Sequence, residues 1–101
     1  MRLRQRAARV GVSGNREYNP GWHTALDLRH LLTVSEAIVT AALARKESRG
    51  GHFRDDFPEK RAEYAGFNYV LRPGADGGME LGKESIAPMR EDLKALVEEY
   101  K

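Results

Sequence analysis

Three residues in the middle of the chain carry the side chains that acyl transfer requires. Ser48, His52 and Asp55 offer a hydroxyl, an imidazole and a carboxylate within one short stretch. In that chemistry the imidazole removes the proton of the attacking hydroxyl, and the carboxylate orients the imidazole. No strand–turn–helix pattern surrounds Ser48, and closeness in sequence is a poor guide to the geometry of such groups. We therefore interpret the stretch as a structural loop whose charges pair with one another.

The same stretch also contains groups that bind metal ions. His52, Asp55 and Asp56 offer one imidazole and two carboxylates, which suit several divalent cations. The other histidines, His23 and His30, lie at the opposite end of a long predicted helix. A cluster of surface salt bridges explains these charges better, and we therefore predict no metal site.

A glycine-rich segment, Gly74–Gly78, raises the question of a phosphate site. A phosphate cradle needs its glycines between a buried strand and the N-terminus of a helix. That context is absent here, and Asp76-Gly77 supplies the positive φ of a tight hairpin turn. We therefore predict a turn and no cofactor-binding residue in this segment.

The N-terminal segment is basic. Arg2, Arg4, Arg6 and Arg9 precede the first acidic residue, Glu17, and a row of arginines is suited to phosphate contacts. No aromatic stacking platform or zinc motif accompanies the row, and the C-terminal helix is acidic. Arginines on the outer face of a helix explain the pattern, and we predict no nucleic-acid partner.

Composition limits the class of protein. The chain has 101 residues, of which 41% are hydrophobic and 32% are charged, with a net charge of +2, which predicts one small domain over residues 1–101 and excludes a multidomain enzyme. There is no cysteine, which excludes disulfides, thiolate metal sites and cysteine nucleophiles. No apolar run approaches the ~20 residues of a membrane span, and the N-terminus lacks the apolar stretch of a signal peptide.

The N-terminal half of the chain has helical periodicity. Residues 2–10 predict a short helix with Leu3, Ala7 and Val10 on one face. The helix starts without an N-cap, which suggests that the chain is a fragment of a longer one. Asn19-Pro20-Gly21 is expected to form a turn. A long helix is expected after it, from about Thr24 to Ser48, mostly buried, since its apolar residues recur at three- and four-residue steps: Leu28, Leu31, Leu32, Ile38, Val39 and Leu43.

The C-terminal half combines a loop, a hairpin and a final helix. We expect a loop over residues 49–66, strands at 67–72 and 79–81 joined by a tight turn, and an amphipathic helix over 90–101. The predicted fold class is therefore mainly α: an antiparallel helical bundle of about three helices with a small β-hairpin.

Three strings of residues resemble a known family. They are Tyr18-Asn19-Pro20-Gly21-Trp22, Asp27-Leu28 and the longer Leu43-Ala44-Arg45-Lys46-Glu47-Ser48-Arg49-Gly50-Gly51-His52-Phe53-Arg54-Asp55-Asp56-Phe57-Pro58. Over roughly residues 2 to 100 the chain resembles the C-terminal domain of succinate dehydrogenase and fumarate reductase flavoprotein subunits. It departs from that pattern at Gly51, where many members have alanine, and at Asn68-Tyr69, where many have a histidine. L-aspartate oxidases share a similar Glu-Ser-Arg-Gly-x-His string but tend to end soon after it.

The resemblance implies an intact subunit that moves a hydride between a dicarboxylate and flavin adenine dinucleotide (FAD) and passes electrons to an iron–sulfur subunit. In the family, the groups that hold the flavin and the dicarboxylate precede this region. We therefore expect no catalytic, cofactor-binding or metal-binding residue in this chain, no activity of the chain alone, and FAD only in the intact subunit. The implied location is cytoplasmic, peripheral on the inner face of the cell membrane as part of the intact complex.

The resemblance leaves a supporting role for the loop after the long helix. Its candidate structural and interface residues are Glu47, Arg49, His52, Arg54, Asp55 and Asp56. Glu47 and Arg49 are expected to anchor the end of the long helix. Residues 52–56 are expected to face the flavin-binding and capping domains of the same subunit or the iron–sulfur subunit.

Two other functions remain open at this stage. The first alternative is a free-standing module that binds a protein or a nucleic acid. The second alternative is the C-terminal domain of an L-aspartate oxidase. In every case, helix faces left uncovered favour self-association.

Overall fold

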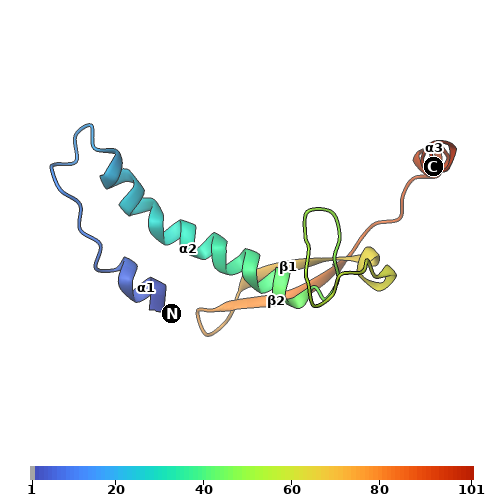
Figure 1. Ribbon diagram of the computed structural model, residues 1–101, viewed down its shortest axis with the longest axis horizontal. Coiled ribbons are helices and arrows are strands. Elements are labelled where there is room, and N and C mark those ends of the chain that lie inside the picture. Colours follow the sequence, from blue (N-terminus) through green and yellow to red (C-terminus); the bar gives the residue numbers. More distant parts are fainter. Residues whose placement is uncertain (1) are drawn as a thin grey trace. The chain divides into compact units, whose positions relative to one another are not determined.

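The computed structural model describes residues 2–101 and contains three α-helices, one short 3-10 helix and one β-hairpin (Figure 1). The chain divides into two compact units, one ending at Lys46 and the other spanning Glu47–Lys101. The first unit holds helices α1 (Arg2–Ala7) and α2 (Pro20–Ala44), and the second holds the hairpin and helix α3 (Glu91–Glu99). The single domain over residues 1–101 and the antiparallel bundle stay predictions, whereas the helices and the small hairpin are confirmed.

Helix α2 begins four residues earlier than the predicted Thr24, because Asn19 and Pro20 start it. The Asn19 side-chain oxygen accepts a hydrogen bond from the backbone N–H of Trp22 at 3.3 Å, which satisfies a donor that a helix start leaves free. Pro20 then occupies the first turn, where its fixed φ is favourable and its missing N–H costs nothing. The Asn-Pro pair, expected to form a turn, is therefore a helix start.

Asn19 also holds the connection between α1 and α2. Its side-chain N–H groups donate to the carbonyl oxygens of Ser13 at 2.9 Å and Asn15 at 2.7 Å. The neighbouring Tyr18 has a positive φ of 49° and is fully exposed, an uncommon conformation for a bulky residue. One side chain thus fixes both the helix start and the segment that leads into it.

Helix α2 ends at Ala44, not at the predicted Ser48. Arg45 leaves the helical region with φ −81° and ψ 100°, while its backbone N–H still reaches the carbonyl of Ala41. The next residues, from Glu47 onward, use their side chains to close a loop. Their intrinsic helix propensity is therefore overridden by tertiary contacts.

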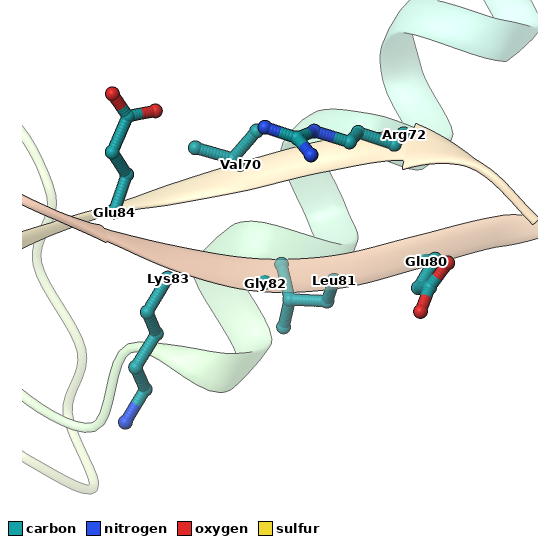
Figure 2. A pocket seen from close by; sticks show the side chains of 7 residues that line it. All are labelled: Val70, Arg72, Glu80, Leu81, Gly82, Lys83 and Glu84. Carbon is teal, nitrogen blue, oxygen red and sulfur yellow. The ribbon is translucent and has the colours of Figure 1, made fainter.

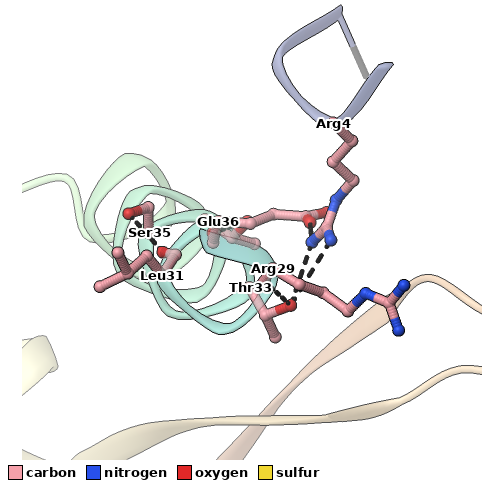
Figure 3. Close-up of polar contacts among 7 residues, drawn as sticks. Arg4, Arg29, Leu31, Thr33, Ser35 and Glu36 are labelled. Atoms are coloured by element: carbon pink, nitrogen blue, oxygen red, sulfur yellow. Dashed lines mark hydrogen bonds and ion pairs between the residues drawn. The ribbon is translucent and has the colours of Figure 1, made fainter. Parts of the chain in front are cut away.

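Helices α1 and α2 run in opposite directions and are joined by an arginine. The Arg4 guanidinium donates to Glu36 Oε2 at 2.6 Å and lies 3.4 Å from Thr33 Oγ1 (Figure 3). Helix α1 ends at Ala7, so it is shorter than the predicted 2–10 and Val10 lies beyond it. Of the three residues predicted to share a face, Ala7 is half-buried, whereas Leu3 and Val10 are at least half exposed.

The prediction that α2 is mostly buried is also wrong for this chain. Leu31, Val34, Ile38 and Leu43 are between 54% and 67% exposed. Among residues 2–101, no hydrophobic side chain is buried. The periodicity of α2 therefore identified an apolar face, and the first unit by itself does not bury that face among its described residues.

The β-hairpin pairs strand β1 (Phe67–Pro73) with strand β2 (Met79–Ser85) in antiparallel register. The predicted turn is confirmed: Gly77 has φ 83°, and Asp76 accepts a hydrogen bond from the Gly78 N–H at 3.0 Å. The second strand is longer than the predicted 79–81 because pairing continues to Phe67↔Ser85. A polar sequence is thus held as a strand by its partner.

Two helices flank the hairpin in the sequence. The 3-10 helix η1 (Ala62–Gly66), which was not predicted, leads into β1, and the Ile86 N–H returns to the Gly66 carbonyl at 3.0 Å. Helix α3 is shorter than the predicted 90–101 at both ends, and its apolar stripe, Leu93, Leu96 and Val97, remains about half exposed. No helix within residues 2–101 is long and apolar enough to cross a membrane.

Candidate functional site

The loop of residues 47–61, here called the latched loop, is closed by a buried carboxylate. The Glu47 side chain has no exposed surface. Its oxygens accept hydrogen bonds from Arg49 Nε at 2.9 Å, from Arg49 Nη2 at 3.2 Å and from the backbone N–H of Arg61 at 2.9 Å. Arg49 Nη2 also donates to the Arg61 carbonyl at 2.9 Å. Glu47 and Arg49 therefore join the two ends of the loop.

This arrangement compensates the cost of burying a charge. A buried carboxylate is tolerated when a cation and several donors satisfy it, and a two-pronged contact with arginine is the strongest form of such a pair. Arg49 keeps about one third of its side-chain surface exposed. The pair is therefore buried at Glu47 and open to solvent at Arg49.

Ser48 fastens the middle of the loop. Its backbone N–H donates to the Glu59 carbonyl at 3.1 Å, and its hydroxyl donates to the Phe57 carbonyl at 2.8 Å. The hydroxyl oxygen accepts the backbone N–H of Arg54 at 3.0 Å. The hydroxyl proton is thus held by a carbonyl group, and the loop uses Ser48 as a structural residue, as interpreted from the sequence.

The tip of the loop is a tight turn. Arg49 and His52 exchange both backbone hydrogen bonds, at 2.8 and 3.0 Å, across Gly50 and Gly51. Gly50 has φ 58°, which favours glycine at this position of a two-residue turn. A Cβ at Gly51 would meet no atom within 4 Å. The departure from alanine at this position therefore has no steric cause in the loop.

Arg54 and Asp56 form a second, more exposed ion pair. Arg54 Nε and Nη2 donate to the two carboxylate oxygens of Asp56 at 2.9 and 2.7 Å. These hydrogen bonds lower the pKa of Asp56 and raise the pKa of Arg54. The guanidinium groups of Arg54 and Arg61 also lie 4.9 and 5.3 Å from the centre of the Phe57 ring.

The structure gathers the six nominated residues in one loop, but it uses most of their charges internally. Glu47 pairs with Arg49, and Arg54 pairs with Asp56. His52 contributes its backbone to the tip, and Asp55 is exposed in the following turn. Two further loop residues with a structural role were not predicted from the sequence. Arg61 was missed because it lies 14 positions after its partner Glu47. Phe57 was missed because only the folded loop brings Arg54 and Arg61 next to its ring. No local sequence signal marks either contact.

The described residues offer neither a metal-binding cluster nor a phosphate cradle at the glycine-rich turn. Among residues 2–101, no three histidine, aspartate or glutamate side chains gather to hold a metal ion. Gly74 and Gly78 close the hairpin turn through a 2.7 Å backbone hydrogen bond, and strands flank that turn on both sides. This turn does not fit the diphosphate of FAD, which needs a helix N-terminus behind the glycines.

The hairpin carries a surface hollow of about 300 Å³ that includes charged residues of both signs. Lys83 and Glu84 point away from one another (Figure 2), and Arg72 is paired in register with Glu80. The charges therefore do not converge on a common point. This hollow offers no arrangement for catalysis.

The comparison with protein families decides the identity of the domain. A family model described as the C-terminal part of the fumarate reductase flavoprotein matches residues 1–98. The chain belongs to this family. The resemblance drawn from strings at residues 18–22, 27–28 and 43–58 is therefore confirmed over nearly the whole length.

Relatives of this flavoprotein C-terminal domain include enzymes with several names. The fumarate reductase flavoprotein subunit of Mycobacterium tuberculosis is 35% identical over 81 residues, which cover 79% of the chain and 14% of the relative. One subunit of the fumarate reductase (CoM/CoB) of Methanothermobacter marburgensis is 43% identical over 47 residues, or 46% of the chain and 9% of the relative. The L-aspartate oxidase of Vibrio cholerae is 50% identical over 38 residues, or 38% of the chain and 7% of the relative.

The chain thus spans about one seventh or less of the length of these curated relatives. No solved structure matches it.

Proposed function

We propose that this chain is the supporting C-terminal domain of an FAD-dependent oxidoreductase that interconverts succinate and fumarate. The observation that carries the proposal is the family match over residues 1–98. The Mycobacterium tuberculosis fumarate reductase flavoprotein subunit, which aligns with 79% of the chain, supports it further. FAD and the dicarboxylate are held by the part of the flavoprotein that precedes this domain in its relatives.

The domain acts through its shape and its contacts, without a catalytic residue of its own. Its nominated side chains close the latched loop: the Glu47 carboxylate and the Ser48 hydroxyl both make hydrogen bonds inside it. The partners of the loop are the flavin-binding and capping domains of the same subunit and the iron–sulfur subunit. The chain alone is inactive, and it binds neither FAD nor nucleic acid.

The exposed apolar stripes indicate what the intact subunit adds. Leu31, Val34 and Ile38 on α2, and Leu93 and Leu96 on α3, lie about half exposed at the spacing of packing faces. In the intact subunit these faces are covered, and the three helices form an antiparallel bundle. The complex lies in the cytoplasm, peripheral on the inner face of the cell membrane.

A second candidate function rests on the L-aspartate oxidase relatives. Their matches reach 50% identity, yet the one from Vibrio cholerae covers only 38% of the chain. The fumarate reductase match covers twice that share, which favours the succinate and fumarate reaction. Assaying the intact flavoprotein with succinate, fumarate and L-aspartate separates the two functions, because turnover of L-aspartate alone contradicts the first.

The first test is to sequence the source DNA upstream of the Met1 codon. A reading frame that continues upstream into a segment with Gly-x-Gly-x-x-Gly after a strand supports the proposal. A stop codon and a ribosome-binding site directly upstream contradict it. That result makes the chain a free-standing interaction module, and salt-sensitive binding then indicates phosphate contacts.

The anchoring role of the loop is tested with Arg49→Ala in the intact enzyme. The change leaves the buried Glu47 carboxylate without its cation, and breaking such a pair costs about 3 to 5 kcal/mol when both partners are buried. Because Arg49 is one-third exposed, we expect about 1 to 3 kcal/mol and a matching loss of assembled enzyme on size-exclusion chromatography. Arg90→Ala, which removes an exposed pair with Asp92, is the control. Unchanged assembly and turnover in Arg49→Ala would show that the pair anchors nothing.

A further inference from the structure

The latched loop presents an exposed aromatic side chain beside its charged ones. Four of its six nominated charged residues pair within the loop, as Glu47–Arg49 and Arg54–Asp56. Phe53, between the two pairs, is 69% exposed. Many of the other exposed apolar side chains lie on helices, whereas Tyr18, Ile86 and Met89 lie in connecting segments. Phe53 lies in the latched loop, directly after its tight turn.

The position of Phe53 is fixed on both sides by hydrogen bonds within the loop. The residue before it, His52, exchanges backbone hydrogen bonds with Arg49 at 2.8 and 3.0 Å. The residue after it, Arg54, donates its backbone N–H to Ser48 Oγ at 3.0 Å. A side chain held in this way loses little backbone entropy on binding. Exposed aromatic residues at preorganised positions are typical anchors of protein interfaces.

We propose that Phe53 is the anchor by which the latched loop docks onto the preceding part of the same flavoprotein chain, in an apolar pocket bordered by a cation that meets the exposed Asp55. The inference rests on the proposed function, because it requires a longer flavoprotein around this domain. The inference adds to the proposed function the residue that makes the contact and the chemistry of the pocket that receives it. It also moves the recognition role from the charged residues of the loop to an aromatic one.

The size of the contact indicates a tethered partner. A phenylalanine buries at most about 150 to 250 Å², whereas a stable complex between separate proteins needs about 800 Å² on each side. One aromatic anchor is too small to hold a separate protein, but it suffices for a surface linked in the same chain, where the effective concentration is high. The chain covers 14% of the Mycobacterium tuberculosis relative, so a relative of this kind has a large preceding segment to supply the pocket.

The test uses the intact flavoprotein that contains this chain, as wild type, Phe53→Ala and Tyr100→Ala. Tyr100 is 82% exposed at the end of α3 and serves as the matched aromatic control. The first readout is the rate of limited proteolysis at the junction that precedes this domain. The second is hydrogen exchange at the Arg54 and Arg61 amides, which reports whether the latched loop is closed.

We expect Phe53→Ala to raise the cleavage rate about 10- to 100-fold, the range that follows from removing one buried aromatic contact. Loop protection should stay at the wild-type level, and Tyr100→Ala should behave as wild type. Asp55→Asn should give a smaller increase in the same direction. A rate unchanged in Phe53→Ala overturns the proposal, and so does a loss of loop protection, which would mean that Phe53 stabilises the loop itself.

The failure of this inference differs from the failure of the proposed function. If no flavin-binding segment precedes the domain in its reading frame, both are wrong. If the intact protein binds FAD and turns over a dicarboxylate while Phe53→Ala has no effect, only the anchor is wrong. Each outcome therefore identifies the statement that it contradicts.

Discussion

At the scale of single residues, Glu47 has the strongest structural role in the described chain. It is a fully buried carboxylate that accepts hydrogen bonds from Arg49 and from the Arg61 backbone. The free energy of loop closure therefore depends on its charge as well as its shape. A neutral side chain of the same shape isolates the effect of the charge.

Glu47→Gln should open the latched loop more often. The amide keeps the volume but places an N–H₂ group among donors, and a hydrogen bond to a charged group contributes about 1.5 to 3 kcal/mol. Because Arg49 is partly exposed, we expect the lower part of that range, or about tenfold faster hydrogen exchange at the Arg61 amide. Glu98→Gln, which affects an exposed pair with Lys101, should leave that amide unchanged. Equal exchange in both variants would show that the charge of Glu47 is not needed.

Asp56 gives the loop a dependence on acid pH. Its pKa is lowered because Arg54 donates hydrogen bonds to it, so in the acid range the unfolded loop binds more protons than the closed one. The resulting stabilisation is present above the ordinary aspartate pKa of about 3.9 and is lost as pH falls below it. Since Asp56 is largely exposed, the contribution is small.

This pKa is measurable by carboxyl-carbon NMR titration. Arg54→Gln should raise the pKa of Asp56 toward about 3.9, whereas Arg90→Gln, in the pair with Asp92, should not move it. A pKa that is the same in wild type and Arg54→Gln would refute the pairing as its cause.

The nominated residues show how far sequence reasoning reaches at this scale. The Glu47–Asp56 string was found because its residues lie close together in sequence. Its closure by Arg61 and its aromatic centre, Phe57, depend on contacts that the loop creates. Phe53 was passed over because the string was interpreted through its charges, and exposure is visible only in the structure.

At the scale of elements, local signals located helices and strands, and non-local contacts set their ends. Asp76-Gly77 predicted the hairpin turn correctly, because a turn is determined by its own residues. The start of α2 was also readable, since Asn followed by Pro is a helix-start signal, but it was interpreted as a turn. The end of α2 could not be predicted from local residues. Glu47 has good helix propensity, but α2 ends before it and its side chain closes the loop.

Asn19 provides a test at the element scale. Asn19→Ala removes the cap of α2 and both bonds to the preceding segment, so we expect a loss of about 1 to 2 kcal/mol and faster hydrogen exchange at the Trp22 amide. Asn19→Asp keeps the cap oxygen and should retain that protection, while it loses the donors to Ser13 and Asn15. If both variants exchange alike at Trp22, the side-chain cap is not what starts the helix.

At the scale of the whole molecule, the described chain is marked by exposed apolar side chains on its helices. Its periodicity predicted the long helix, but the predicted burial of that helix is not found within residues 2–101. Apolar periodicity identifies which side of a helix is apolar, but it carries no information about which residues cover that side. The helices and hairpin could therefore be predicted, whereas burial could not.

The uncovered surface predicts self-association of the 101-residue chain. Leu31, Val34 and Ile38 form an exposed stripe on α2, and burying such a side chain contributes about 1.5 to 3 kcal/mol. Size-exclusion chromatography with light scattering should show a dimer or larger species, and Ile38→Lys should weaken it at least about tenfold. Leu3→Lys, outside the stripe, should have little effect. A monomer at every concentration would contradict the prediction.

The hydrogen bond between the Glu47 carboxylate and the Arg61 backbone also bears on when the loop can close during synthesis of the chain. The bonds of the loop join residues no more than 14 positions apart, so the entropy lost in closing the loop is modest and its contact order is low. The loop is complete once Arg61 has left the ribosome, before the hairpin strands and α3 are available. The nascent chain can therefore close this loop on the basis of local contacts alone, without waiting for β1, β2 and α3 to leave the ribosome.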